Sequence, residues 1–184
     1  YDAATGAVVS GTSVLLSAEA PGAGSTADNT PYTGDTVSVT GSGTAVGTYN
    51  SKDVASATTV SFSGTSLTGA QAGNYTLTAH PTQVATVTPK SVTQSGLTVP
   101  SSKIYDAATG AVVSGTSVLL SAEAPGAGST ADNTPYTGDT VSVTGSVTAV
   151  GTYNSKDVAS AATVSFSGTS LTGAQAGNYT LTAH

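Results

Sequence analysis

The sequence of 184 residues contains no cysteine, methionine or tryptophan, and its four basic residues are all lysines. Without cysteine, the chain has no disulfide framework, no thiolate zinc site and no thiol nucleophile. Ten acidic residues outnumber the lysines and give a net charge of -6. Because so few cations are available to neutralise phosphates, the composition argues against nucleic acid and against an anionic membrane surface as partners.

Long apolar runs are also missing from the sequence. No segment approaches the roughly 20 residues that a membrane-spanning helix needs, and no signal peptide is visible. The chain begins abruptly at Tyr1. We therefore expect it to be a fragment cut from a longer protein.

Residue types that usually perform catalysis are scarce. The only histidines are His80 and His184, and a metal site usually needs three or more converging ligands. We interpret both as solvated strand ends. No G-x-S-x-G motif frames a serine, and the glycine-rich stretch 21–25 lacks the lysine of a phosphate-binding loop. The sequence therefore predicts no enzyme activity, no catalytic residue and no cofactor.

One unit occurs twice in the chain. Residues 1–80 (copy one) and 105–184 (copy two) align without gaps and differ at two positions, where Gly43 is replaced by Val147 and Thr58 by Ala162. The stretch between the copies occurs once. A period of this length is too long for a solenoid repeat and is typical of an independent domain.

The repeat predicts two tandem domains. The first covers residues 1–90 and lacks its N-terminal strands, and the second covers residues 91–184 and lacks its final strand. Strand exchange with a neighbour is therefore a hypothesis for this chain. Between the domains, Pro89 and Pro100 predict a short, stiff connector.

Each copy contains short stretches in which apolar residues alternate with Thr or Ser, separated by clusters of Gly, Pro, Asn and Asp. Such alternation is typical of strands that are buried on one face. In copy one the predicted strands are residues 35–41, 58–64, 75–79 and 84–88. We therefore predict an all-β fold of two tandem immunoglobulin-like (Greek-key) β-sandwich domains. The alternative is a β-grasp-like unit in which residues 13–20 form a short helix.

The motif Ala-Gly-Asn-Tyr near the end of each copy predicts a tyrosine corner. In immunoglobulin-like sandwiches, a tyrosine near the start of one strand bonds through its hydroxyl to the main chain a few residues upstream. Tyr75 and Tyr179 have this position, and Gly73 and Gly177 would adopt a positive φ before them. We interpret all four residues as structural.

Two pairs of tyrosines are less well explained by strand alternation. Tyr32 and Tyr49, with their copies Tyr136 and Tyr153, are our candidate ligand-binding residues for a glycan or matrix polymer bound by avidity. A shelf of exposed rings would favour binding. Burial of all four rings would favour a spacer.

Three further patterns have structural and functional interpretations. Aspartates around one loop of each copy could bind calcium, although turn formation explains them without a metal; these candidates are Asp28, Asp35, Asp132 and Asp139. Asn74 and Asn178 begin N-x-Thr sequons, which we interpret as turn residues. Lys52 could form an isopeptide bond with an asparagine, but we favour an edge-strand lysine that blocks aggregation.

Several motifs occur in a fixed order along the repeat: Lys103–Asp106, Gly138–Val141, Tyr153–Val158 and Leu171–Tyr179. Over essentially the whole unit this order resembles the YDG-type repeat domains of large filamentous-haemagglutinin-like bacterial surface adhesins. One departure is the alanine that follows Tyr-Asp in both copies, where the family has glycine.

The resemblance implies a function and a location. It implies an exported, cell-surface or secreted bacterial protein in which such repeats form a stalk that projects an adhesive region for attachment or biofilm formation. The partners would be neighbouring repeats of the same chain. In the alternative function, a polysaccharide or host matrix surface would also be a partner.

Overall fold

The computed structural model describes residues 1–22, 26–126 and 129–182, and the chain divides into two compact units. The N-terminal unit comprises Thr5–Ser51 and Ala57–Thr86. The C-terminal unit comprises Val87–His184 together with Tyr1–Ala4 and Lys52–Ser56. Two short segments of copy one therefore belong to the C-terminal unit, which divides the chain differently from the predicted boundary after residue 90.

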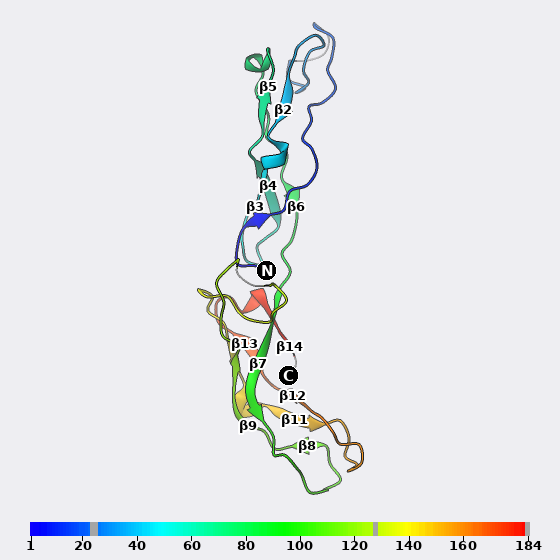
Figure 1. Cartoon of the computed structure of the whole chain (residues 1–184), viewed down its shortest axis with the longest axis vertical. Helices are drawn as coiled ribbons and strands as arrows, with labels where there is room; N and C mark the ends of the chain where they lie inside the picture. The colour runs from blue at the N-terminus through cyan, green and yellow to red at the C-terminus, as the bar shows by residue number, and fades with distance from the viewer. Residues whose placement is uncertain (23–25, 127–128, 183–184) are drawn as a thin grey trace. The chain divides into compact units, whose positions relative to one another are not determined.

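The C-terminal unit is built around β7 (Lys90–Thr98), which lies between β14 (Tyr179–Thr182) and β9 (Ser114–Leu119) in Figure 1. β14 runs parallel to β7, and β9 runs antiparallel to it. A second sheet has the order β12-β11-β8, and β10 pairs with β13. The bounds of these strands are β8 Gly110–Ala111, β10 Ser142–Thr144, β11 Val150–Tyr153, β12 Val164–Ser167 and β13 Ser170–Thr172.

The buried side chains of β7 explain its central position. Lys90, Val92 and Gln94 alternate with more exposed residues, and Leu97 resumes the buried series after a β-bulge. At the bulge Gly96 has a φ of 91°, and a Cβ there would collide with the main chain of β9. A bulge of this kind pins the register of the two strands. The register in turn directs Lys90 and Val92 inward, because a slip of one residue exchanges the two faces of a strand.

The core of the C-terminal unit combines residues from both sequence copies. Tyr1 of copy one packs with Val92 of β7 and with Tyr136 and Tyr179 of copy two. The partly buried apolar residues against this cluster are Ala3, Val54, Val87, Leu119, Val141, Leu171 and Leu181. Residues of the Tyr1–Ala4 and Lys52–Ser56 segments are thus part of the packing that holds this unit together.

The N-terminal unit contains a four-stranded sheet of order β1-β3-β4-β6 and a separate pair of strands, β2 and β5. The bounds are β1 Gly6–Ala7, β2 Ser38–Thr40, β3 Val46–Tyr49, β4 Thr59–Ser63, β5 Ser66–Thr68 and β6 Gln83–Val84. Residues 10–15 and 75–78, all of them described, form no strand. Their counterparts in copy two form β9 and β14.

The prediction of an all-β fold is confirmed, and the sheets are consistent with β-sandwich domains. The helical segments of the described residues are four 3₁₀ turns: η1 Ser42–Thr44, η2 Ala72–Asn74, η3 Ser146–Thr148 and η4 Ala176–Asn178. Residues 13–20 form no helix, so the structure lacks the feature on which the β-grasp-like alternative depended. The predicted connector is wrong, because residues 90–98 form the longest strand.

Candidate functional site

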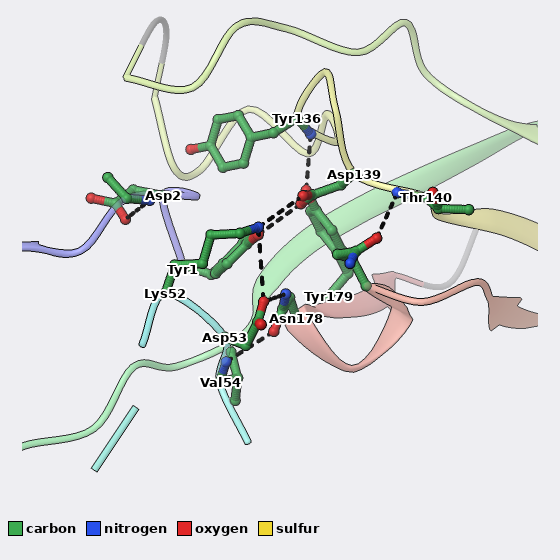
Figure 2. Close-up of polar contacts among 12 residues, drawn as sticks. Tyr1, Asp2, Lys52, Asp53, Val54, Tyr136, Asp139, Thr140, Asn178 and Tyr179 are labelled. Carbon is green, nitrogen blue, oxygen red and sulfur yellow. Dashed lines mark hydrogen bonds and ion pairs between the residues drawn. The ribbon is translucent and has the colours of Figure 1, made fainter. Parts of the chain in front are cut away.

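Asp139 is the centre of a polar network that joins copy one to copy two within the C-terminal unit (Figure 2). Its Oδ2 atom accepts hydrogen bonds from the hydroxyls of Tyr1 at 2.8 Å and Tyr179 at 2.7 Å. Its Oδ1 atom lies 3.1 Å from the ammonium group of Lys52. The side chain of Asp139 is only 5% exposed. One buried carboxylate therefore accepts hydrogen bonds from two phenol hydroxyls and forms an ion pair with one lysine.

The aromatic rings around this carboxylate pack closely. The ring of Tyr1 lies edge-on to that of Tyr179, with centroids 5.4 Å apart, and 6.0 Å from the ring of Tyr136. Edge-to-face pairs of this kind contribute about 0.5–1.5 kcal/mol beyond their buried area. Tyr1 thus fixes its N-terminal segment by packing as well as by its hydroxyl.

Asn178 makes a second connection between the copies. Its Oδ1 atom accepts a hydrogen bond from the main-chain nitrogen of Val54 at 2.9 Å, and its Nδ2 atom donates to Asp53 at 2.7 Å. Asn178 is buried at the end of η4, directly before β14. We call the residues of these two connections the seam: Tyr1, Lys52, Asp53 and Val54 from copy one, with Tyr136, Asp139, Asn178 and Tyr179 from copy two.

The protonation states within the seam follow from its contacts. Burial opposes the ionised form of Asp139, but hydrogen bonds from Tyr179, Tyr1 and Lys52 hold the pKa of this carboxyl below its ordinary value. Burial raises the pKa of the Tyr179 phenol. The hydrogen bond to Tyr1 raises the pKa of Lys52. Asp139 is therefore an anion that accepts hydrogen bonds from two neutral phenols and a protonated lysine.

Next to the seam, Lys90 of β7 occupies a pocket of complementary charge. Its side chain is 0% exposed and its ammonium group lies 2.6 Å from Glu123 and 2.9 Å from Asp132. The same group lies 4.0 Å from the centroid of the Tyr136 ring, a cation–π distance. Lys90 lowers the pKa of Asp132. We call Glu123, Asp132 and Tyr136 the lysine socket.

The tyrosine-corner residues are structural in a different geometry from the one predicted. The hydroxyl of Tyr179 accepts a hydrogen bond from the main-chain nitrogen of Tyr136 at 2.9 Å, 43 residues upstream, and Tyr75 makes the matching bond with Tyr32 at 3.0 Å. The tyrosine therefore ties two distant loops, not one local turn. The prediction of a positive φ at Gly73 and Gly177 is wrong, because both lie in 3₁₀ turns.

The four candidate ligand-binding tyrosines do not form an open shelf. Tyr136 is buried beneath Lys90, and Tyr32, Tyr49 and Tyr153 are half-buried. Tyr49 lines a cavity of about 560 Å³ in the N-terminal unit. Tyr153 lines one of about 240 Å³ in the C-terminal unit. Their role in ligand binding stays a prediction.

The candidate calcium aspartates have protein partners. Asp132 and Asp139 bind lysines, and Asp35 accepts the hydroxyl of Tyr75 at 2.6 Å. Asp28 accepts hydrogen bonds from the main-chain nitrogen and the hydroxyl of Thr30, as a turn-forming aspartate does. No group of three potential metal ligands gathers within the described ranges.

The remaining residues singled out from the sequence have simple surroundings. His80 is exposed and its ring stacks edge-on against Phe62 at 5.0 Å, whereas His184 lies outside the described residues. Lys52 lies in the bend that follows β3, so its prediction as an edge-strand lysine is wrong. Asn74 is exposed, whereas Asn178 is buried in the seam.

Sequence reasoning missed Tyr1, Lys90 and Glu123. Lys90 was placed at the end of the first predicted domain with no role, and Glu123 had no visible partner in the sequence. One signal was available: Lys90 begins a stretch of alternating residues, Lys-Ser-Val-Thr-Gln, with Val92 at the second alternate position. A lysine in phase with buried apolar residues indicates a buried cation with anionic partners.

None of the helices in the described residues is long and apolar enough to cross a membrane.

Comparisons with known proteins identify one family. Neither a curated protein nor a solved structure is significantly similar to the chain. The sequence profile of the YDG domain matches residues 1–83 and again residues 88–184. The two matches cover nearly the whole chain, and the chain therefore belongs to the YDG domain family.

Proposed function

We propose that the chain is a structural tandem-repeat module, a spacer in the stalk of a large bacterial cell-surface or secreted adhesin of the filamentous-haemagglutinin-like kind. In this function the repeats project an adhesive region for attachment or biofilm formation and have no catalytic activity. Their partners are neighbouring repeats of the same chain. The location is extracellular.

The seam is the observation that carries this proposal. Each half of the seam is present in both copies, because Tyr1, Lys52 and Asp53 recur as Tyr105, Lys156 and Asp157. The other half recurs in the same way. A repeat that carries both halves of a joint can be linked to a further repeat at either end, and a series of such joints resists bending better than flexible linkers do. This property suits a spacer.

Single-molecule force spectroscopy of the intact chain tests the spacer function. Lys52→Met removes the cation from the seam, while Lys156→Met removes an exposed lysine that pairs with its neighbour Asp157. We expect the first variant to lower the unfolding force of the C-terminal unit and the second to leave it unchanged. If both variants and the parent chain unfolded at the same force, the seam would not contribute to the mechanical resistance of the C-terminal unit, and the proposal would be contradicted.

A second candidate is a glycan- or matrix-binding module that acts by avidity. The observation in its favour is that Tyr49 and its copy Tyr153 each line a cavity, and the larger cavity has a volume typical of small-ligand sites. A screen of the multivalently displayed chain against bacterial and host polysaccharides, with and without calcium, tests it. Saturable binding that is lost in Tyr49→Ala and Tyr153→Ala would favour this function over the spacer. If no polysaccharide in the panel binds, the spacer function remains the better explanation.

A further inference from the structure

Two segments of identical sequence have different structures in the two copies. In copy two they lie beside β7, and in copy one they do not. Residues 114–119 and 179–182 are strands that hydrogen-bond to the two edges of β7. The identical residues 10–15 and 75–78 of copy one, all described, form no strand. Neither of the two substitutions between the copies lies in these segments. In copy two, both segments have β7 beside them, which supplies the hydrogen-bonding partner of each strand.

In the loops that hold β7 in copy two, several main-chain features of the described residues recur in copy one. Glu19 donates from its main-chain nitrogen to Pro31 at 2.9 Å and accepts from Thr33 at 2.6 Å, and Glu123 makes the equivalent bonds at 2.9 and 2.6 Å. Asn29 has a φ of 66° and Asn133 one of 64°. In copy two the carbonyl oxygen of Asn133 accepts from Thr93 of β7. Copy one thus shares these features of the framework, and among the described residues no strand occupies the position of β7.

The charges of copy one match the lysine of β7. The N-terminal unit contains no lysine or arginine, and its acidic residues are Glu19, Asp28 and Asp35. All four lysines of the chain pair with carboxylates of the C-terminal unit. The Oε1 atom of Glu19 is buried without a hydrogen-bond partner among the described residues. Its counterpart in copy two is the carboxylate that binds Lys90.

The protonation of Glu19 is consistent with a missing cation. Burial and the neighbouring Asp28 raise the pKa of the Glu19 carboxyl. In copy two Lys90 has the opposite effect on Asp132, whose pKa it lowers. A buried carboxylate without a cation is costly, and a lysine placed beside it removes that cost.

An open cavity lies where the second half of the strand would bind. It has a volume of about 560 Å³, and its lining includes Ser10, Gly11 and Ser13. In copy two the counterparts of Ser10 and Gly11 pair with Thr98 and Leu97 of β7. Val14, which follows the lining residue Ser13 in sequence, is 78% exposed, compared with 51% for Val118 in copy two. The cavity and the exposed valine indicate a place for a strand.

We propose that copy one is a strand-acceptor site, and that its occupant is a strand with the sequence of residues 87–100 from another repeat of this type. The lysine of that strand binds between Glu19 and Asp28, over the ring of Tyr32. The strand runs parallel to residues 75–78 and antiparallel to residues 10–15, in the register of β7. This binding site is independent of the proposed spacer function.

Titration of the chain with a synthetic peptide of residues 87–100 (VTPKSVTQSGLTVP) tests the proposal. We expect saturable binding of one peptide per chain by calorimetry, and new amide protection at residues 10–15 and 75–78 by hydrogen exchange. A Lys90→Met change in the peptide should weaken binding at least about tenfold, because it leaves Glu19 without a cation. This change leaves the fold of the chain itself untouched.

The chain variant Glu19→Gln, with Glu123→Gln as its matched control, gives a second readout. Glu19→Gln should weaken the peptide at least about tenfold, whereas Glu123→Gln should leave the peptide affinity unchanged. Equal affinity for the parent and Lys90→Met peptides would overturn the proposal, as would protection that appears elsewhere in the chain. A scrambled peptide that binds as well as the parent peptide would also overturn it.

A covalent version of the experiment removes the dependence on peptide affinity. Residues 87–104 fused directly before Tyr1 recreate the spacing that separates β7 from Tyr105 in this chain. We expect strand-like protection at residues 10–15 and 75–78 in this fusion, and its loss when the added lysine is changed to methionine. If neither the peptide nor the fusion protects these residues, the proposal is wrong.

Discussion

Copy one and copy two differ at two positions of eighty, yet the Tyr-Thr-Leu-Thr segment is irregular in copy one and forms β14 in copy two. The difference lies in the neighbours of the segment. β14 pairs with β7, and its counterpart at residues 75–78 has no such strand beside it among the described residues. Strand propensity is a preference for a half-buried, paired surface more than a property of the segment alone. The comparison holds the sequence constant and changes the neighbours, which in copy two are β7 and the seam residues of copy one.

The two copies also differ at the other half of the seam. Tyr1 is 8% exposed and holds Asp139, whereas Tyr105 is 55% exposed. Lys52 reaches Asp139 in copy two, whereas its counterpart Lys156 pairs with the adjacent Asp157. Each half of the joint therefore occurs once in its bound form and once in its open form within one chain.

The largest expected effect comes from Lys90→Met, which would make copy two resemble copy one. It leaves Glu123 and Asp132 without their cation, and we expect a loss of about 3 kcal/mol in the stability of the C-terminal unit. Residues 114–119 should lose amide protection in hydrogen exchange. The control Lys156→Met removes an exposed pair and should change the stability by less than about 0.5 kcal/mol. Retained protection at residues 114–119 would show that the lysine does not hold the strand.

Asp139→Asn should have the next largest effect on stability. Asp35→Asn changes the equivalent residue of copy one, so the two variants compare the same position with and without the seam contacts. Asp139 accepts two phenol hydroxyls and a lysine, whereas Asp35 accepts the hydroxyl of Tyr75. We expect a loss of about 2 kcal/mol for the first variant and less than about 1 kcal/mol for the second, each in its own unit. Urea denaturation followed by NMR signals from each unit measures both. Equal losses would mean that Tyr1 and Lys52 add nothing to the joint.

Asn178→Ala tests the second connection of the seam and should have a smaller effect. The variant leaves the main-chain nitrogen of Val54 without its acceptor, and we expect a loss of about 1 kcal/mol. Asn74→Ala changes the same residue in the copy where it is exposed and should cost less than about 0.5 kcal/mol. The same denaturation experiment compares them, and a larger loss for Asn74→Ala would reverse our interpretation of the seam.

The smallest expected effect is a change in the stability of the N-terminal unit relative to that of the C-terminal unit when the pH is lowered from 7 to about 4.5. The pKa of Glu19 is raised on folding, so its unfavourable contribution is relieved as the pH falls through the folded-state value. The pKa values of Asp132 and Asp139 are lowered, so their contribution persists until the pH falls below the ordinary value of 3.8. The N-terminal unit should therefore gain protection relative to the C-terminal unit over this range. A relative loss would contradict the assignment of Glu19.

Much of the fold could be predicted from the sequence because alternation identifies strands directly. The stretches at 35–41 and 58–64 contain β2 and β4. The stretch at 75–79 was predicted as a strand, and only its counterpart in copy two is one, since pairing depends on a segment distant in sequence. The first part of β7, before Leu97, was missed because a proline precedes it and a glycine interrupts its alternation, which together resemble a linker.

The candidate site could be predicted only in part, for a related reason. Tyr179 was identified as structural from its local motif, and its hydroxyl does tie the main chain. Its partner Tyr136 was instead assigned to a ligand surface, because no local pattern shows that a lysine 46 residues away, at position 90, covers its ring. Contacts between the copies depend on which segment leaves its own repeat, and the sequence of one repeat does not contain that information.

The distribution of copy one between the two units sets an order of events during synthesis. All residues of the N-terminal unit are present once Thr86 has been made. The C-terminal unit needs Tyr1 and Lys52 and also Asn178 and β14, which lie far later in the sequence and are made much later. Domains generally fold in the order in which they are synthesised. The early segments of copy one therefore find their partners only after copy two has been translated.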